Sequence, residues 1–244
     1  MKKDRLDKVL ISLGLAQSRD RAKAMIMTGN VLVNRLPVDK PGAMVSLDAR
    51  IEFKGEEIPY VSRGGLKLEA ALHEFQFDVH GLDCIDIGAS TGGFTDCLLQ
   101  HGARRVFAVD VGYGQLAWKL RQDPRVVVIE RSNIRHLPDA ALPFPMDLAT
   151  IDVSFISLRI VVPAALKFLK KPSVIFALVK PQFEVGKGMV GKGGVVRDPR
   201  QHDAVVEDLA LFFKTLDLTC LNVMPSPILG PKGNREFVMS LARN

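Results

Sequence analysis

The sequence contains little cysteine, and what it has is not arranged for cross-linking or metal binding. Cys84, Cys97 and Cys220 are the three cysteines among 244 residues, and no two of them have the spacing of metal ligands. A few scattered cysteines, odd in number, are typical of reduced thiols in a cytoplasmic protein. We therefore expect a cytoplasmic location, no disulfides and no metal site.

Long apolar runs are also missing. The strongest one, Val174 to Val179, is far shorter than the roughly 20 residues that cross a bilayer. The first residues, Met1 to Arg5, are charged and lead into a helical pattern, with no apolar stretch of the signal-peptide type. Stable insertion into a membrane is therefore not expected.

Basic residues exceed acidic ones, and the excess is concentrated in two stretches. The formal net charge is +6. Residues 1–23 hold seven basic side chains against three acidic ones, and residues 167–200 hold eight against two. Such clustering is typical of surfaces that neutralise nucleic-acid phosphates, although net charge alone fits a merely basic protein equally well.

The first 57 residues predict a small α+β domain. Apolar residues recur at helical spacing from Leu6 to Leu13, and a second amphipathic stretch ends at Gly29. Alternating apolar residues then predict short strands, and residues 58–62, which include Pro59, are the expected linker to a second domain, residues 63–244. The predicted strands are residues 31–33, 45–47 and 50–53.

The second domain alternates apolar strands with helical stretches. This order predicts an α/β fold with a mainly parallel sheet that helices cover on both faces, as in the Rossmann-like methyltransferases. Residues 221–224 and 236–241 are joined by a link too short for a crossover helix, so the last strand is expected to be antiparallel. The preceding strands are expected at residues 84–87, 106–110, 126–129, 148–152 and 174–179, and helical stretches at residues 66–75, 94–99, 115–121 and 160–169.

A glycine-rich turn follows the first of these strands and opens a helix. Its spacing, Gly88, Gly92 and Gly93, matches neither the dinucleotide fingerprint nor the P-loop, and it fits S-adenosylmethionine better. Asp110 could accept both hydrogen bonds from a ribose diol, and Asn133 could recognise adenine. The glycines alone could equally serve tight packing of a helix against a strand. The candidate cofactor-binding residues are Asp86, Gly88, Ala89, Ser90, Gly92, Gly93, Phe94, Asp110, Val111, Asn133 and Asp152.

Four charged residues are expected at one edge of the sheet. Asp152 and Lys180 end the fourth and fifth strands, whose carboxyl ends share that edge, and Glu236 begins the antiparallel last strand there. Lys67, in the helix before the first strand, would have to fold over it. A ribose hydroxyl is a poor nucleophile until its proton is removed, and a lysine near another cation can act as the base. Each residue alone could equally belong to a surface salt bridge.

A long basic stretch follows the fifth strand. Residues 181–199 are rich in glycine and lysine. Long loops of this kind are usually functional lids or disordered segments. The position directly after Lys180 favours a lid that closes on RNA.

Two segments of the first domain resemble the small RNA-binding domain of ribosomal protein S-four. They are Arg19-Asp20-Arg21-Ala22 and Thr28-Gly29-Asn30-Val31-Leu32-Val33-Asn34. The resemblance implies that this domain binds RNA, and arginines near the ligand edge of the second domain could hold phosphates, although solvated helix faces would carry the same charges. The candidate RNA-binding residues are Arg5, Lys8, Arg19, Lys23, Arg63, Arg131 and Arg135.

Motifs along the whole chain resemble the TlyA family of rRNA 2′-O-methyltransferases, which act on cytidine and are sometimes labelled hemolysins. The resemblance implies S-adenosylmethionine as cofactor and ribosomal RNA or a ribosomal subunit as partner. The related FtsJ group uses a Lys-Asp-Lys-Glu tetrad, which falls on Lys67, Asp152, Lys180 and Glu236, with Lys180 as the base. Short ends resemble the members that modify large-subunit rRNA, and the small subunit stays open. The motifs are Ser62-Arg63-Gly64-Gly65-x-Lys67-Leu68, Asp86 to Asp96, Ile151-Asp152-Val153-Ser154-Phe155-Ile156-Ser157-Leu158, Val179-Lys180-Pro181-Gln182-Phe183-Glu184 and Gly194-Val195-Val196-Arg197-Asp198.

Other functions remain as alternatives. An amino-group methylase would carry Asn/Asp-Pro-Pro-Tyr after the fourth strand, where this chain has Asp152-Val153-Ser154-Phe155, and no cysteine ends that strand as a cytosine-carbon methylase requires. A non-catalytic ribosome- or RNA-binding protein on the same scaffold stays open. So does a pore-forming hemolysin, although no membrane-spanning pattern supports it.

Overall fold

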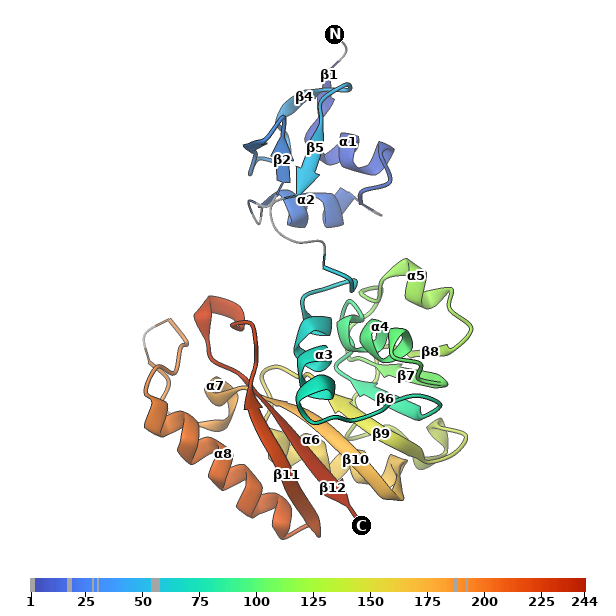
Figure 1. Cartoon of the computed structure of the whole chain (residues 1–244), viewed down its shortest axis with the longest axis vertical. Coiled ribbons are helices and arrows are strands. Elements are labelled where there is room, and N and C mark those ends of the chain that lie inside the picture. The colour runs from blue at the N-terminus through green and yellow to red at the C-terminus, as the bar shows by residue number, and fades with distance from the viewer. Residues whose placement is uncertain are drawn as a thin grey trace. The chain divides into compact units, whose positions relative to one another are not determined.

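The computed structural model describes residues 3–16, 19–27, 29, 31–53, 58–186, 188–191 and 193–244 (Figure 1). The chain divides into two compact units, Met1–Glu57 and Ile58–Asn244, and each has a hydrophobic core of its own. The expected linker, residues 58–62, lies within the second unit. There the ring of Tyr60 is buried, and its hydroxyl donates a hydrogen bond to Glu69 at 2.8 Å.

The first unit is an α+β body, as the sequence predicts. Its core forms where the apolar faces of two helices meet, and Leu6, Leu10 and Ile26 are completely buried there beside Val31. Strands β1 and β4 pair antiparallel, and an antiparallel sheet has the order β3-β2-β5. The elements are β1 Lys3–Arg5, α1 Leu6–Ser12, α2 Arg19–Met27, β2 Val31–Val33, β3 Leu36–Pro37, β4 Met44–Ser46 and β5 Ile51–Phe53.

A twisted, mainly parallel sheet forms the centre of the second unit (Figure 1). Its order is β11-β12-β10-β9-β6-β7-β8, and β12 runs antiparallel to both of its neighbours. The predicted fold, with an antiparallel last strand, is therefore confirmed. The strands are β6 Asp83–Ile87, β7 Arg105–Val109, β8 Val126–Ile129, β9 Met146–Ile151, β10 Leu169–Val179, β11 Leu218–Pro225 and β12 Phe237–Arg243.

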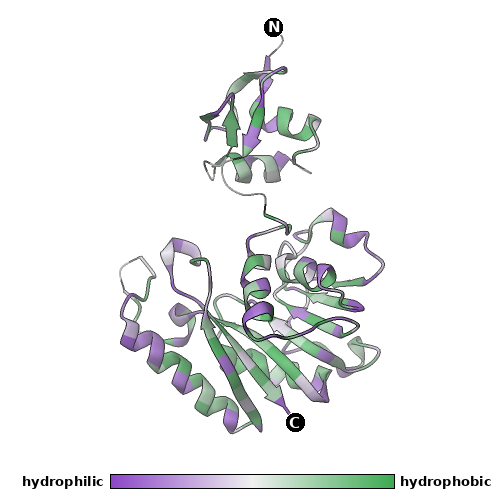
Figure 2. Cartoon of the chain, in the orientation of Figure 1, coloured by the Kyte–Doolittle hydropathy of each residue, from purple (hydrophilic) through white to green (hydrophobic). Residues whose placement is uncertain are grey.

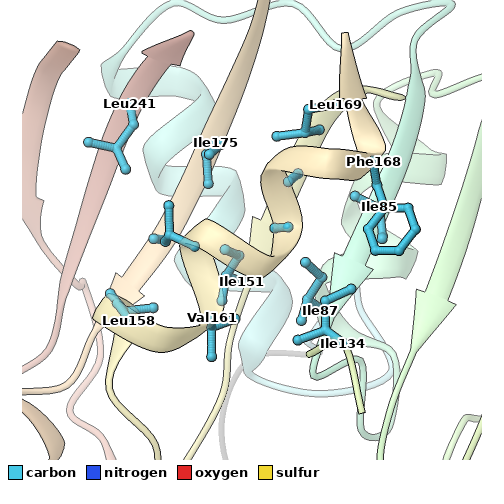
Figure 3. Packing of buried hydrophobic residues seen from close by; sticks show 14 of the residues in the cluster. Ile85, Ile87, Ile134, Ile151, Leu158, Val161, Phe168, Leu169, Ile175 and Leu241 are labelled. Atoms are coloured by element: carbon cyan, nitrogen blue, oxygen red, sulfur yellow. The ribbon is translucent and has the colours of Figure 1, made fainter. Parts of the chain in front are cut away.

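Helices cover both faces of this sheet. Successive residues of its strands point to opposite sides, and the inner strands are apolar on both, so each face needs a covering layer. Ile85 and Ile87 of β6 pack in one cluster with α6 (Figure 3), and α8 belongs to the same cluster, whereas Cys84 packs in another with α3 and α4. Hydropathy follows burial: the inner strands are mostly green in Figure 2, and α8 carries purple, polar stretches. The helices are α3 Gly64–Glu74, α4 Gly93–Gln100, α5 Trp118–Arg121, α6 Leu158–Ala165, α7 Pro181–Glu184 and α8 Pro199–Lys214, with short 3-10 turns at Asp139–Ala141, Leu166–Phe168 and Pro231–Gly233.

One predicted helix is much shorter in the structure. The sequence predicts helix over residues 115–121, but α5 begins only at Trp118. The backbone N–H of Ala117 donates to the carbonyl of Thr91 in the glycine-rich turn, at 3.1 Å. A contact to another segment therefore replaces the first helical turn.

The expected lid is described only in part. After α7, Gly191 and Val195 form an isolated bridge, and Asp198 caps the start of α8 by accepting a hydrogen bond from the backbone of Arg200. Lys187 and Lys192 lie outside the described residues. Closure of this segment on RNA stays a prediction.

Candidate active site

The glycine-rich turn begins where β6 ends, against the end of β9. Gly88 has φ +85°, and a Cβ atom there would lie 2.5 Å from the carbonyl oxygen of Asp152. The backbone N–H of Asp152 in turn donates to the carbonyl of Ile87 at 3.0 Å. Only glycine tolerates both this conformation and this approach. The turn is thus fixed beside Asp152, as close packing around a ligand loop requires.

Asp86 lies beneath the turn and lines neither of the two cavities described below. Its carboxylate is completely buried and accepts hydrogen bonds from the hydroxyls of Thr95, at 2.7 Å, and Thr150, at 3.1 Å. Burial raises the pKa of Asp86 to about 7, although the threonine hydroxyls act in the opposite direction. The structure thus gives Asp86 a supporting place under the turn and no open surface toward a ligand.

A cavity of about 510 Å³ opens between the ends of β6, β7 and β9. Its wall contains Asp110, Val111 and Asn133, three of the predicted cofactor residues, together with apolar side chains such as Ile134 and Ile156. Asp110 accepts hydrogen bonds from the backbone N–H of Ser90, at 2.7 Å, and of Gly112, at 2.6 Å. An apolar slot with a carboxylate and an amide at its rim suits a nucleoside.

Asn133 is already engaged by its neighbour. Its side-chain oxygen accepts hydrogen bonds from the backbone N–H and the guanidinium of Arg135, at 3.1 and 3.3 Å. The side-chain NH₂ group is the part of Asn133 that stays available to a base, since an amide carries both a donor and an acceptor end.

A second cavity, of about 440 Å³, contains all four members of the predicted tetrad. Lys67 comes from α3, Asp152 follows β9, Lys180 follows β10 and Glu236 precedes β12. This cavity shares Gly88, Ser90, Asp152 and Ser154 with the first one, so the two adjoin at the end of β9. Of the remaining turn residues, Ala89, Gly93 and Phe94 also line it, whereas Gly92 does not.

The tetrad forms two ion pairs. The ammonium of Lys67 lies 2.5 Å from Glu236 Oε2, and that of Lys180 lies 2.6 Å from Asp152 Oδ1. Both lysines are only 8 % exposed, and Glu236 is 1 % exposed. Each buried cation therefore has its own carboxylate, which offsets the cost of removing it from water. Among the described side chains, Glu236 Oε1 and Gln182 Oε1 are the buried oxygen atoms without a hydrogen-bond partner.

Three of the four predicted RNA-binding residues of the first unit contact acidic neighbours. Arg5 and Arg19 both contact the buried carboxylate of Asp7, at 2.9 and 3.2 Å, and the Arg5 guanidinium holds the pKa of Asp7 well below its usual range. Lys8 lies 3.6 Å from Asp4, and Lys23 is half-buried on α2. The arginines therefore stabilise the unit, and their partly exposed side chains still reach solvent.

In the second unit the predicted RNA contacts are dispersed. Arg63 lines the cavity of the tetrad. Arg131 lies over the ring of Tyr113, with 4.1 Å between the guanidinium carbon and the ring centroid. Arg135 lies beside Phe155 and Phe183 at a separate hollow. Only Arg63 is brought together with the tetrad.

Sequence reasoning missed several residues near the two cavities. Ser154 accepts a hydrogen bond from Lys180 at 3.0 Å. Phe155, 90 % exposed at φ +63°, lies against Phe183 with ring centroids 5.0 Å apart. Both residues belong to the motif after the fourth strand, Asp152-Val153-Ser154-Phe155, so their position in that motif is the signal that could have identified them. Gly230 lies in the loop between β11 and β12, and no motif in the sequence identifies it as a residue of the site.

Two classes of feature are absent from the part of the chain that the structure describes. None of its helices has the length and apolarity that crossing a membrane requires. No group of three or more His, Cys, Asp or Glu side chains in it could hold a metal ion.

Models of two protein families match the chain. The FtsJ-like methyltransferase model covers residues 60–243, and the S4 domain model covers residues 4–51. The tetrad and both cavities lie in the first of these ranges.

Relatives match along almost the full length. YqxC of Bacillus subtilis, provisionally named an rRNA methyltransferase, is 52% identical over 98% of this chain and 86% of its own. The 16S/23S rRNA (cytidine-2′-O)-methyltransferase TlyA of Mycobacterium tuberculosis is 48% identical over 97% of this chain and 89% of its own. A solved structure from Streptococcus thermophilus, provisionally described as a hemolysin, has a TM-score of 0.80 and 44% identity, over 100% of this chain and 90% of that one.

Proposed function

The chain belongs to the FtsJ-like methyltransferases and carries an S4 domain before the catalytic one, and from this premise we propose that it methylates the ribose 2′-hydroxyl of a cytidine in ribosomal RNA. It is a methyltransferase, and S-adenosylmethionine is its methyl donor. The 2′-hydroxyl as acceptor and rRNA as substrate are the parts that the proposal adds. They rest on the tetrad and on the names of the relatives.

The observation that carries the proposal is the meeting of the tetrad with the cofactor residues. Asp152 lines both cavities, and its backbone lies against Gly88 of the glycine-rich turn. A nucleoside in the first cavity and a ribose in the second would therefore meet at the end of β9. The residues fit the donor in chemistry as well: an apolar slot for adenine, a carboxylate at its rim and a turn without Cβ atoms where the backbone bends.

The mechanism that we propose uses the two ion pairs differently. S-adenosylmethionine, when bound, supplies an electrophilic methyl group. Lys180 first releases a proton to water; its neutral amine, oriented by Asp152 and Ser154, then takes the proton of the ribose hydroxyl as the oxygen attacks the methyl group. The pair of Lys67 and Glu236 lies in the same cavity and holds the ribose. In-line placement then supplies much of the rate.

Substrate recognition is assigned mainly to the first unit. S4 domains bind RNA, and the exposed basic residues of this unit would add affinity through phosphate contacts. The substrate would be ribosomal RNA, free or in a subunit, in the cytoplasm. Assays with the rRNA of each subunit distinguish which of the two is the substrate.

The test is to identify the modified nucleoside. Purified protein, S-adenosylmethionine and each of the two large rRNAs, free and within subunits, would be incubated and digested to nucleosides for mass spectrometry. We expect 2′-O-methylcytidine, with the transferred methyl group on the ribose, from large-subunit rRNA, and the same assay shows whether small-subunit rRNA is modified as well. Methylation on a base would contradict the assignment of the acceptor. Binding of rRNA without any methylation would favour the non-catalytic alternative.

A further inference from the structure

Asn234 has a buried amide that joins two loops of the second unit. It is 3 % exposed and lies between β11 and β12, two residues before Glu236. Its side-chain oxygen accepts a hydrogen bond from the backbone N–H of Val196, at 3.1 Å, and its NH₂ group donates to the carbonyls of Gly194, at 3.0 Å, and Pro231, at 3.1 Å. Residues 194–196 belong to the segment before α8. The two loops therefore share one side-chain amide.

These contacts require an amide in one orientation. One partner is a backbone N–H and the other two are carbonyl oxygens. If the side-chain oxygen and nitrogen of Asn234 were exchanged, its NH₂ group would lie against the N–H donor and its oxygen against the two carbonyl acceptors. An aspartate has the same shape but no donor. A buried polar group that loses such partners is costly, so the site is specific for asparagine.

From Asn234 the contacts continue to the catalytic carboxylate. The carbonyl of Asn234 accepts a hydrogen bond from the N–H of Gly230 at 2.9 Å. A Cβ atom on Gly230 would lie 2.0 Å from Glu236 Oε1, so the backbone of Gly230 is the wall against which that carboxylate rests. The other oxygen of Glu236 holds the ammonium of Lys67 at 2.5 Å. The position of Glu236 thus depends on the loop that Asn234 fastens.

The second loop is held from its other side by His202 of α8. The Nε2 atom of His202 lies 2.9 Å from the carbonyl of Val196, and because that partner is an acceptor, Nε2 carries the proton. The imidazole ring packs against Phe237, with centroids 5.7 Å apart, and Phe237 follows Glu236 directly. Buried contacts therefore close a ring around Glu236, from Asn234 through Val196 and His202 to Phe237.

We propose that Asn234 is a positioning residue for the Lys67–Glu236 pair. By fastening residues 194–196 to the loop before β12, its amide keeps Gly230 against Glu236 and thereby keeps Lys67 in the catalytic cavity. The inference rests on the proposed function for its meaning in turnover, but the contact geometry can be tested without turnover.

The first test measures the accessibility of Lys67. Wild type, Asn234→Ala and Asn234→Asp would be treated with a low dose of acetic anhydride, and acetylation of individual lysines would be quantified by mass spectrometry. We expect labelling of Lys67 to rise by about threefold or more in both variants, because local opening exposes the ammonium. Lys180 is the matched control: it is equally buried, but Asp152 and Ser154 hold it, so its labelling should not change.

The second test asks whether Asn234 acts through Glu236. We expect Asn234→Ala to lower kcat by about tenfold or more, with KM for rRNA and Kd for S-adenosylmethionine changed less than about threefold. In a Glu236→Ala background the same substitution should lower kcat by less than about twofold, because residues that act together are not additive. Asn222→Ala, on the exposed edge strand β11, is the matched control and should retain wild-type kcat.

Gly230→Ala provides a second route to the same result if the Asn234 variants fold poorly. Its methyl group would press on Glu236 Oε1 without touching the amide, and it should reproduce the labelling of Lys67 and the loss of kcat. Unchanged Lys67 labelling in these variants, or an equal rise at Lys180, would overturn the inference. If acetylation of Lys67 and Lys180 follows the expected pattern but the wild type never methylates rRNA, the proposed function alone would be contradicted.

Discussion

The carboxyl of Asp86 gives the second unit a stability that depends on pH in a predictable direction. Its pKa is raised to about 7 by burial, against 3.8 for an ordinary aspartate. We expect that Asp86→Asn removes this dependence, since an amide is neutral throughout the range. The Asn side chain has the same shape and can still accept from one threonine hydroxyl and donate to the other.

The sign and size follow from proton linkage. A carboxyl that is harder to ionise in the folded protein costs nothing well below pH 3.8, where both states are protonated. The cost grows as pH rises, because the unfolded chain releases its proton first. It levels off above pH 7 at about 4 kcal/mol, since folding raises the pKa from 3.8 to about 7. Between pH 5 and pH 8, wild type should therefore lose about 2 to 3 kcal/mol relative to Asp86→Asn.

Urea unfolding at pH 5, 6, 7 and 8 would measure this difference for the transition of the second unit. Asp203→Asn, on the exposed side of α8, controls for loss of one negative charge. The difference in unfolding free energy between wild type and Asp86→Asn should change steadily in favour of the variant. A difference that is the same at every pH would refute the assignment of a buried carboxyl that resists ionisation.

Other predictions follow from the turn, the first unit and Arg63. Gly88→Ala should weaken S-adenosylmethionine binding by about tenfold or more in calorimetry, because a Cβ atom 2.5 Å from the carbonyl of Asp152 forces the turn aside; unchanged affinity would show that the turn does not hold the donor. Removal of residues 1–57, a cut that spares the buried Tyr60, should reduce rRNA affinity by about tenfold or more and leave S-adenosylmethionine affinity unchanged; equal rRNA affinity would deny the unit its role. Arg63→Ala should raise KM for rRNA more than it lowers kcat, since Arg63 lines the cavity where the acceptor would lie; a loss confined to kcat would place it in the chemistry instead.

Much of the second unit follows from the sequence because its strands are buried on both faces. The apolar run at residues 174–179 is recognisable as a strand from its apolarity alone, and the short link before Glu236 predicts an antiparallel last strand. The insertion of β12 between β10 and β11 is not predictable in this way, because it depends on pairing between distant segments. Residues 115–117 are not helical, contrary to the prediction, for the same reason. The backbone N–H of Ala117 makes a long-range hydrogen bond to Thr91, which competes with the local helix propensity.

The meeting of the tetrad residues at one edge follows from strand ends, but their pairing does not. Topology places Asp152, Lys180 and Glu236 together, whereas only coordinates show which lysine faces which carboxylate. For Asp86 the motif predicts a ligand contact, whereas the structure shows a completely buried carboxylate beneath the turn, so that contact stays a prediction. Burial of a short polar side chain depends on neighbours such as Thr150, which no local pattern reveals.

In the proposed mechanism, Lys180 accepts the proton of the ribose hydroxyl that is methylated. Single-turnover methylation of rRNA by Lys180→Met, beside wild type and the exposed control Lys214→Met, tests it most directly, because methionine keeps the apolar stem and removes the ammonium. We predict a loss of about 10²- to 10⁴-fold in rate, with S-adenosylmethionine and rRNA affinities within about threefold of wild type. A Lys180→Met enzyme that methylates rRNA at the wild-type rate would contradict the account.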